Sequence, residues 1–388
     1  MLEINSTIIK HNSLLIYGSY FLFSLTFSFL LNKLFLKFSS TLGTKNNGDG
    51  SVVRWSSTAK PVLGGLSFYI LFLLSVSIYF AFFNIGSSVS YSNTFIGLLL
   101  SMAVGFLVGL ADDAYNTKPF LKFSAQFACA FILIATGVYI KVFDNFYLNA
   151  ILTIFWVVGI MNSVNMLDNM DGITSTVSSF IILSVIILIL LNRDLNNLHL
   201  IISIGVLAAL IGFLFFNWNP SKMYMGDTGS QFLGVFLSAF GILYFWNDYY
   251  VDLSGNYSLL KKFITVGIAF LLPLVDTTVV VINRLRQGRS PFVGGRDHTT
   301  HSLAFLGLTD RQVAIAFGLL SLNSMFLVVI IKYFISQWSG VYELIFASYF
   351  FVILGFFFFA TNKKIAAEKK IEQYSSTIIE KNLVSSPH

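Results

Sequence analysis

The chain has 388 residues, of which 56% are hydrophobic, and its formal net charge is +6. Only 11% of the residues are charged, whereas about 25% are charged in an average soluble domain, so this composition excludes an ordinary soluble fold. The single cysteine, Cys129, excludes an intramolecular disulfide and a cysteine-cluster metal site. The composition predicts an all-α, polytopic membrane protein.

Apolar stretches recur along the whole chain, and many of them approach or exceed the roughly 20 residues that a helix needs to span a bilayer. The first lacks a basic leader directly before it and a small-residue cleavage site after it, which indicates an uncleaved span. We therefore expect about 11 transmembrane helices. They are predicted at 14–32, 61–83, 94–110, 123–140, 150–165, 173–191, 199–217, 229–246, 262–283, 313–334 and 342–361.

The spans make up one expected integral membrane domain, residues 1–361, followed by a cytoplasmic C-terminal tail, residues 362–388. The tail suits either a short amphipathic helix at the membrane surface or a solvated segment. Of the 24 Lys and Arg residues, 18 fall on the side of the membrane that the tail shares. The positive-inside rule makes this side cytoplasmic.

The unusual polar clusters all fall on the predicted cytoplasmic side, whereas the outer loops are short and plain. A transporter needs polar groups near the bilayer midplane, so this pattern favours an enzyme with a cytoplasmic active-site cleft. The clusters lie at 58–65, 109–123, 162–173, 223–230 and 284–302.

The first acidic cluster holds two adjacent aspartates, Asp112 and Asp113. Neighbouring carboxylates repel each other unless they share a cation or a proton, and ionisable residues between spans are often functional. Lys122 and Gln126 follow at i, i+4 spacing and so share a helix face. A solvated acidic pair and a lysine that reaches lipid headgroups remain the alternatives.

The next cluster, NSVNMLDNMDGI, ends an apolar run. Asn162, Asn165 and Asn169 have the spacing of one helical stripe, with Asp168 and Asp171 on or beside it. Amide and carboxylate oxygens suit Mg²⁺ or Mn²⁺. One asparagine would serve as interhelical polar glue, but five such groups need more partners than neighbouring helices usually offer.

In MGDTGS, Asp227 stands between Gly226 and Gly229 just before a predicted span. The glycines allow close backbone approach, and the free N–H groups of the following helix suit a phosphate. A plain N-cap by Asp227 or Thr228 is the alternative, and capping does not exclude metal binding.

The last cluster is a loop rich in arginine and histidine. Its basic residues satisfy the positive-inside rule or hold anionic lipid, but its central part also contains proline and glycine, which indicates a shaped loop for phosphate or sugar. A zinc site formed by the two histidines of this loop is a weaker hypothesis, because no third ligand is evident nearby. Asp276 lies within a span and needs a partner or a proton. The candidate binding residues here are Arg289, Arg296, His298 and His301.

Together these clusters contain the groups used in Mg²⁺-dependent phosphoryl transfer. From Lys60 to about Leu303 the motifs, in order, resemble the polyprenyl-phosphate N-acetylhexosamine-1-phosphate transferases. The resemblance implies ten or eleven transmembrane helices in the plasma membrane, often as a homodimer, and no nucleic-acid partner. It also implies transfer of a sugar-1-phosphate, GlcNAc-1-phosphate as the commonest case, from a UDP-sugar to undecaprenyl phosphate with release of UMP, which initiates cell-envelope polysaccharide synthesis.

The resemblance also implies roles for the matching residues. Asp227 becomes the main Mg²⁺ ligand, with Asn165. Lys122 holds the diphosphate, and Asp112 acts on the lipid phosphate as base or orienting group. The remaining matches are Asp113 in the paired-aspartate motif, Asn162 and Asp168 in the asparagine–aspartate motif, Asp171 for uracil, and Arg289, Arg296, His298 and His301 for the diphosphate or sugar.

Two positions depart from the family pattern. Thr300 stands where many members have a histidine, which argues against the pentapeptide-bearing sugar as donor. Asn169 stands where many have glycine, so we expect it to meet any strained turn there. The rival hypotheses are a secondary transporter, a CDP-alcohol phosphotransferase, whose sequence pattern is absent, and a non-catalytic scaffold of the same fold.

Overall fold

The computed structural model describes residues 2–38, 60–83, 92–195, 197–247, 258–290, 295 and 297–384. Within these ranges every long element is a helix, and the β pairing consists of one isolated bridge between Val62 and Tyr224. The helices are α1 Leu2–Phe38, α2 Gly64–Ile78, α3 Asn93–Tyr115, α4 Pro119–Ala135, α5 Phe146–Leu167, α6 Ile173–Leu191, α7 Leu198–Asn217, α8 Gly226–Gly241, α9 Leu259–Ala269, α10 Leu271–Arg286, α11 Thr299–Phe305, α12 Asp310–Val329 and α13 Gly340–Val384, with π-helical turns at Tyr79–Phe83, Ile242–Trp246 and Ile330–Phe334.

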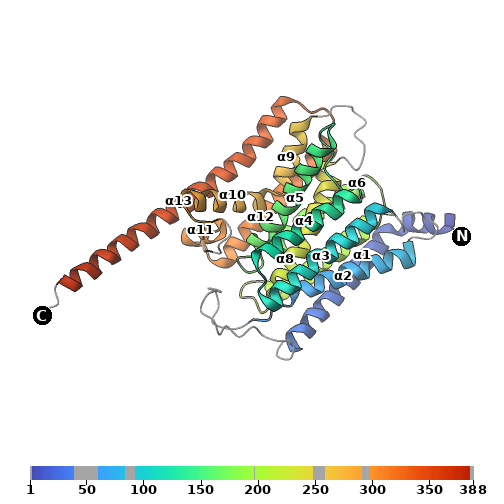
Figure 1. Ribbon diagram of the computed structural model, residues 1–388. Helices are drawn as coiled ribbons and strands as arrows, with labels where there is room; N and C mark the ends of the chain where they lie inside the picture. Colours follow the sequence, from blue (N-terminus) through green and yellow to red (C-terminus); the bar gives the residue numbers. More distant parts are fainter. Residues whose placement is uncertain are drawn as a thin grey trace.

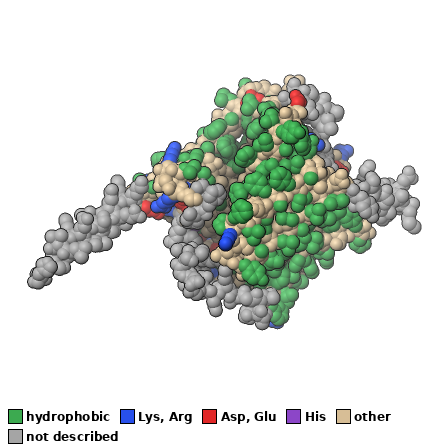
Figure 2. Space-filling model, viewed as in Figure 1, with side chains coloured by type: hydrophobic (Ala, Val, Ile, Leu, Met, Phe, Trp, Pro, Cys, Tyr) green, Lys and Arg blue, Asp and Glu red, His purple; other side chains and the backbone are tan. Residues whose placement is uncertain are grey.

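The all-α polytopic fold expected from the composition is confirmed. In the described ranges, nine helices are long and apolar enough to cross a membrane, or ten if α9 and α10 form one span. Helix α4 begins four residues before and ends five residues before the span predicted at 123–140, because Pro119 favours a start in its first turn and Gly137, whose φ is +90°, follows its end. Figure 2 shows hydrophobic side chains over most of the visible face of the bundle, as lipid contact requires.

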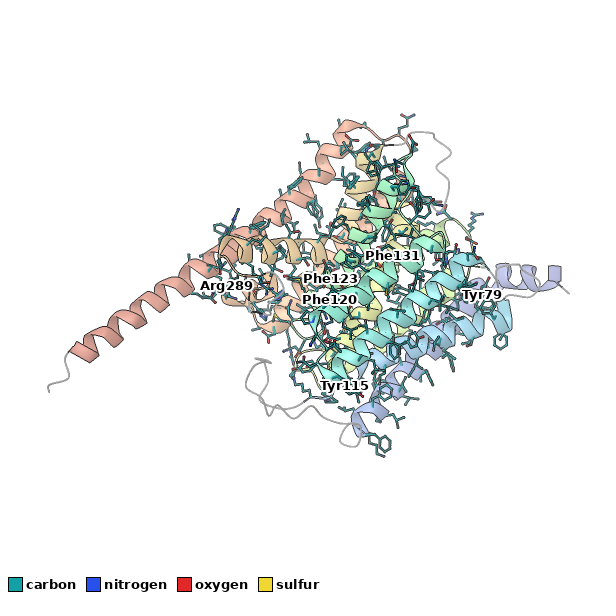
Figure 3. The ribbon with its side chains drawn as sticks, in the orientation of Figure 1. Tyr79, Tyr115, Phe120, Phe123, Phe131 and Arg289 are labelled. Carbon is teal, nitrogen blue, oxygen red and sulfur yellow. The ribbon has the colours of Figure 1, made fainter. Side chains whose placement is uncertain are left out.

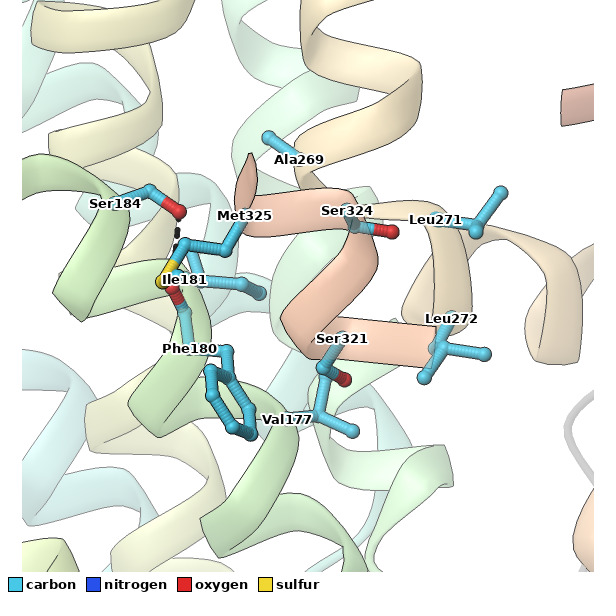
Figure 4. A pocket seen from close by; sticks show the side chains of 10 residues that line it. All are labelled: Val177, Phe180, Ile181, Ser184, Ala269, Leu271, Leu272, Ser321, Ser324 and Met325. Atoms are coloured by element: carbon cyan, nitrogen blue, oxygen red, sulfur yellow. Dashed lines mark hydrogen bonds between the residues drawn. The ribbon is translucent and has the colours of Figure 1, made fainter. Parts of the chain in front are cut away.

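The span predicted at 262–283 is broken, because the chain forms two helices there, α9 and α10, which meet at an angle of 85°. Pro273 lies in the first turn of α10, where its missing N–H costs no helical hydrogen bond. A pocket beside the break lies between α6, α9, α10 and α12, and Figure 4 shows Ser184, Ser321 and Met325 among the side chains that line it. Helix α10 packs against α5 and α13.

The last helix does not end where the last span was expected to end. Residues 362–384 continue α13 without a break, and Figure 1 shows this helix extending well beyond the bundle toward the C-terminus. Where it leaves the bundle, α13 packs against α11, and the hydroxyl groups of Ser302 and Thr361 lie 3.0 Å apart. The helix thus braces the short α11 from the side.

The start of α8 lies deep between neighbouring helices because two glycines let them approach. A Cβ on Gly109 of α3 would lie 2.3 Å from the carbonyl oxygen of Asp227, and a Cβ on Gly65 of α2 would lie 2.1 Å from the backbone nitrogen of Gly229. Only glycine permits backbone contact this close. These two contacts fix the height and rotation of the helix that carries Asp227.

Candidate active site

The predicted acidic residues of α3 and α8 meet around one lysine. Lys122, in the first turns of α4, places its Nζ 3.1 Å from Asp112 Oδ2 and 3.1 Å from Asp227 Oδ1. The exposed fraction of the side chain is 20% for Lys122, 12% for Asp112 and 26% for Asp227. A cation and two carboxylates are thus held together yet open to a ligand, as a site for a phosphate-rich substrate requires.

Exposed aromatic rings mark the edge of this cluster. Tyr115 at the end of α3 is 84% exposed and Phe120 at the start of α4 is 82% exposed, and Figure 3 labels both rings. Tyrosine at such a position is typical of the membrane–water interface. Asp112 lies one helical turn before Tyr115, so the cluster lies beside these exposed rings.

Asp113 has a different task from its neighbour. Its carboxylate accepts hydrogen bonds from the backbone N–H of Asp227 at 3.0 Å, and from the N–H and hydroxyl of Thr228 at 2.8 and 2.6 Å. Asp113 therefore caps α8 from another helix. The alternative role of Asp227 or Thr228 as N-cap does not hold, since the N-cap position is Met225, and two of the N–H groups expected to bind phosphate are already occupied.

Helix α5 supplies the asparagines as predicted. The amide nitrogen of Asn165 donates to Asp227 Oδ1 at 2.5 Å and to Ser230 Oγ at 2.8 Å, so Asn165 orients the Asp227 carboxylate. One turn earlier, Asn162 and Gln126 exchange hydrogen bonds, and Gln126 also donates to Gln231. These amides form a polar layer between α4, α5 and α8 beneath the acidic cluster.

Asp168 follows directly after α5 and faces the same cluster. Burial raises the pKa of its carboxyl, and the negative charges of Asp227 and Asp113 raise it further, to about 7. Burial and the nearby carboxylates of Asp227 and Asp113 both disfavour a further negative charge here. This is the electrostatic surrounding in which a bound divalent cation is favourable.

Asp171 is engaged with the segment that precedes α8. Its carboxylate accepts from the backbone N–H of Ser221 at 2.9 Å, from the Ser221 hydroxyl at 2.8 Å and from the Asn219 amide at 3.2 Å. Lys60 donates to the same hydroxyl at 3.0 Å. A contact between Asp171 and uracil, as the resemblance implies, therefore has to come in addition to these bonds.

The histidine-bearing loop is anchored on α10. Asp276 is fully buried and accepts from His298 Nδ1 at 2.9 Å, while Arg284 forms a two-point ion pair with Asp297, with both N···O distances 2.7 Å. Burial opposes ionisation of Asp297, but the hydrogen bonds and charge of Arg284 outweigh it and lower the pKa of this carboxyl. Arg284 thus holds the loop.

The other predicted residues of this loop differ in how far their side chains are buried. His301 is buried, and its ring centre lies 6.1 Å from that of His298. Arg289 is exposed, and Figure 3 shows it near α10 and α11. Arg296 lies outside the described residues.

The two residues that depart from the family pattern touch each other. The hydroxyl of Thr300, which is fully buried, donates to Asn169 Oδ1 at 2.5 Å. The predicted helical stripe is wrong for Asn169, because α5 ends at Leu167. Asn169 also carries no strained turn, since the positive φ of this segment, +76°, belongs to Gly172. The contact joins the loop of α11 to the turn that bears Asp168.

Thr300→Val keeps the shape of the side chain and removes its hydroxyl. We expect kcat/KM to fall roughly fivefold, because one buried hydrogen bond between the two segments is lost. In an Asn169→Gly background the same change should cost less than about twofold, because its partner is already absent. Steady-state kinetics of the four combinations measure this coupling, and equal losses in both backgrounds would show that the two residues act independently.

Several residues that support the site had not been assigned to it from the sequence. Thr228 and Ser230 lie within the glycine–aspartate segment MGDTGS. Their place beside Asp227 is the only sequence feature that links them to the site. Arg284 had been explained by the positive-inside rule, and nothing in the sequence indicated that Asp297 is its partner. Ser221 had no signal at all, because an isolated serine before a helix has many uses.

Comparison with known proteins identifies the family of this chain. Residues 95–245 match the model of glycosyl transferase family 4. A probable undecaprenyl-phosphate N-acetylglucosaminyl 1-phosphate transferase of Bacillus subtilis is 30% identical over 261 residues, which cover 65% of this chain and 68% of the relative. The chain belongs to this family, the polyprenyl-phosphate N-acetylhexosamine-1-phosphate transferases.

Other members of the family align over similar lengths. A decaprenyl-phosphate N-acetylglucosaminephosphotransferase of Mycobacterium leprae is 27% identical over 280 residues, covering 66% of this chain and 70% of the relative. A phospho-N-acetylmuramoyl-pentapeptide-transferase of Staphylococcus carnosus is 28% identical over 303 residues, covering 71% and 85%. Members of the family transfer a sugar-1-phosphate to a polyprenyl phosphate in the membrane.

Proposed function

We propose that the protein transfers a sugar-1-phosphate, GlcNAc-1-phosphate as first choice, from a UDP-N-acetylhexosamine to undecaprenyl phosphate. The products are undecaprenyl-diphosphate-sugar and UMP, and the reaction takes place on the cytoplasmic face of the plasma membrane. The observation that carries this proposal is Lys122 held between Asp112 and Asp227, close to the exposed rings of Tyr115 and Phe120 that are typical of a membrane–water interface. There a soluble diphosphate and a lipid phosphate both have access.

The side chains of the cluster suit distinct parts of the reaction. Lys122 carries the positive charge that a diphosphate needs. Asp112 is placed to orient the lipid phosphate or take its proton. An oxygen of the lipid phosphate attacks the β-phosphorus of the donor, the bond between this phosphorus and the bridging oxygen breaks, and UMP leaves with that oxygen. His298, with Arg289 and Arg296, is assigned to the diphosphate or the sugar.

The residues present also suit Mg²⁺. In the described part of the chain, no group of three His, Cys, Asp or Glu side chains forms a ready metal cage. Mg²⁺ needs none, since it commonly takes one or two carboxylates and completes its shell with substrate phosphates and water. The carboxylates of Asp227 and Asp113 near Asp168 support a cation here. We assign Asp227 as its main ligand, with Asn165 beside it, and a bound Mg²⁺ supplies neutralisation of the diphosphate charge.

The test is UMP release by purified protein in detergent, given undecaprenyl phosphate, Mg²⁺ and a panel of UDP-N-acetylhexosamines. We expect UMP from one donor, dependent on both lipid and Mg²⁺, and abolished by EDTA and by Asp112→Asn. Replacement of Mg²⁺ by Mn²⁺ should restore activity after EDTA treatment. Absence of UMP from protein that still binds UDP-sugars would point to a donor outside the panel, whereas absence of nucleotide binding would refute the transferase proposal and favour a transporter or scaffold.

A further inference from the structure

Helix α10 holds the loop before α11 through two polar pairs, the ion pair between Arg284 and Asp297 and the hydrogen bond between Asp276 and His298. Asp276 and Arg284 lie eight residues apart, about two helical turns, and both side chains are buried. Their partners, His298 and Asp297, are adjacent in the loop. Two anchors at neighbouring positions fix both the place and the direction of the His298 side chain.

The carboxylate of Asp276 accepts three hydrogen bonds, and all of them come from two adjacent residues, His298 and Thr299. Oδ2 lies 2.9 Å from His298 Nδ1, while Oδ1 accepts from the backbone N–H of Thr299 at 2.8 Å and from its hydroxyl at 2.6 Å. Because a carboxylate only accepts, Nδ1 of His298 must carry the proton. Because Nδ1 faces Asp276, Nε2 of the same ring points away from that carboxylate.

The start of α11 contacts the turn that follows α5. Two residues after His298, Thr300 contacts Asn169 in the turn that carries Asp168. The charged or titratable groups packed near His298 are Asp276 on α10, Asp297 with its partner Arg284, and His301 on α11. His298 therefore lies between a rigid anchor and the turn beside the acidic cluster.

We propose that Asp276 is a positioning residue that acts through His298, keeping the imidazole proton on Nδ1 and directing Nε2 to the bound sugar-diphosphate donor. This inference rests on the proposed function for the ligand of Nε2. A buried carboxylate that orients a histidine is used for this purpose in many sites. The competing explanation is that Asp276 merely anchors the start of α11 through Thr299.

The substitution Asp276→Asn separates the two explanations. The backbone N–H of Thr299 can only donate, so it takes the amide oxygen of the new asparagine. The amide nitrogen then faces His298 Nδ1, which must accept, and the imidazole proton moves to Nε2. The packing is kept, but the hydrogen-bonding character of Nε2 is reversed.

We expect Asp276→Asn to lower kcat/KM for the donor by roughly 10- to 100-fold. In a His298→Ala background it should lower kcat/KM less than about twofold further, because the group on which it acts is gone. The matched control is Thr299→Val, which removes a hydroxyl bond to the same carboxylate without touching His298 and should cost less than roughly fivefold. Asp276 would be only an anchor if Asp276→Asn lowered kcat/KM as much in the His298→Ala background as in the native protein. The same would follow if Thr299→Val lowered kcat/KM as much as Asp276→Asn does.

A second measurement does not depend on activity. ¹⁵N spectra of protein labelled in its five histidines report which ring nitrogen is protonated, and His298→Ala identifies the signal. We expect a protonated Nδ1 in the native protein and its loss in Asp276→Asn. A native His298 protonated only at Nε2 would overturn the inference. If no donor is turned over but this result holds, the proposed function fails while the orienting role of Asp276 stands.

Discussion

Asp227→Ala should abolish transfer while leaving membrane insertion and thermal stability close to native. The Asp227 carboxylate is the partly exposed centre of the cluster, in contact with Lys122 and Asn165, and we assign it as the main Mg²⁺ ligand. Loss of several kcal/mol of charge stabilisation in the transition state corresponds to roughly 10³-fold in rate or more. Because the side chain is not a buried packing element, the fold should tolerate its removal.

The measurement is UMP release at increasing Mg²⁺ concentration, together with thermal unfolding in detergent. Asp144→Ala is the matched control, since Asp144 is exposed in the loop between α4 and α5, away from the acidic cluster. It should keep native activity. Near-normal turnover by Asp227→Ala, with its Mg²⁺ dependence unchanged, would remove Asp227 from the site.

Asp113→Ala should lose both activity and stability, in contrast to Asp227→Ala. The substitution leaves the buried N–H groups of Asp227 and Thr228 without an acceptor, at a cost of about 1–3 kcal/mol each. The first turn of α8 should then fray. We expect a lower midpoint of thermal unfolding and a fall in kcat, because the Asp227 carboxylate is no longer held in place.

The neighbouring aspartate is the natural control. Asp112→Ala removes the second partner of Lys122 but leaves the hydrogen bonds from the α8 backbone to Asp113 in place, so activity should fall while the midpoint changes much less. Comparing the two variants by thermal unfolding and UMP release assigns one aspartate to the chemistry and the other to the scaffold. The assignment is wrong if both variants unfold at the same temperature.

The amino-acid sequence alone was sufficient for the membrane class, most span positions and the identity of the acidic cluster. These features depend on local properties, because an apolar run of sufficient length must span the bilayer and polar groups at its end must find partners. Lys122, Asn165 and Asp227 were all singled out in this way and do meet. The family resemblance rests on the same segments.

The tertiary structure decided which partner each polar group takes. Adjacent residues on a helix point about 100° apart, so Asp112 reaches Lys122 while Asp113 reaches the start of α8, and only the packing of α3 against α8 determines which does which. The sharp break between α9 and α10 likewise brings Asp276 to His298, 22 residues later. Such pairings depend on how helices distant in sequence approach each other, and no local pattern in the sequence encodes that approach.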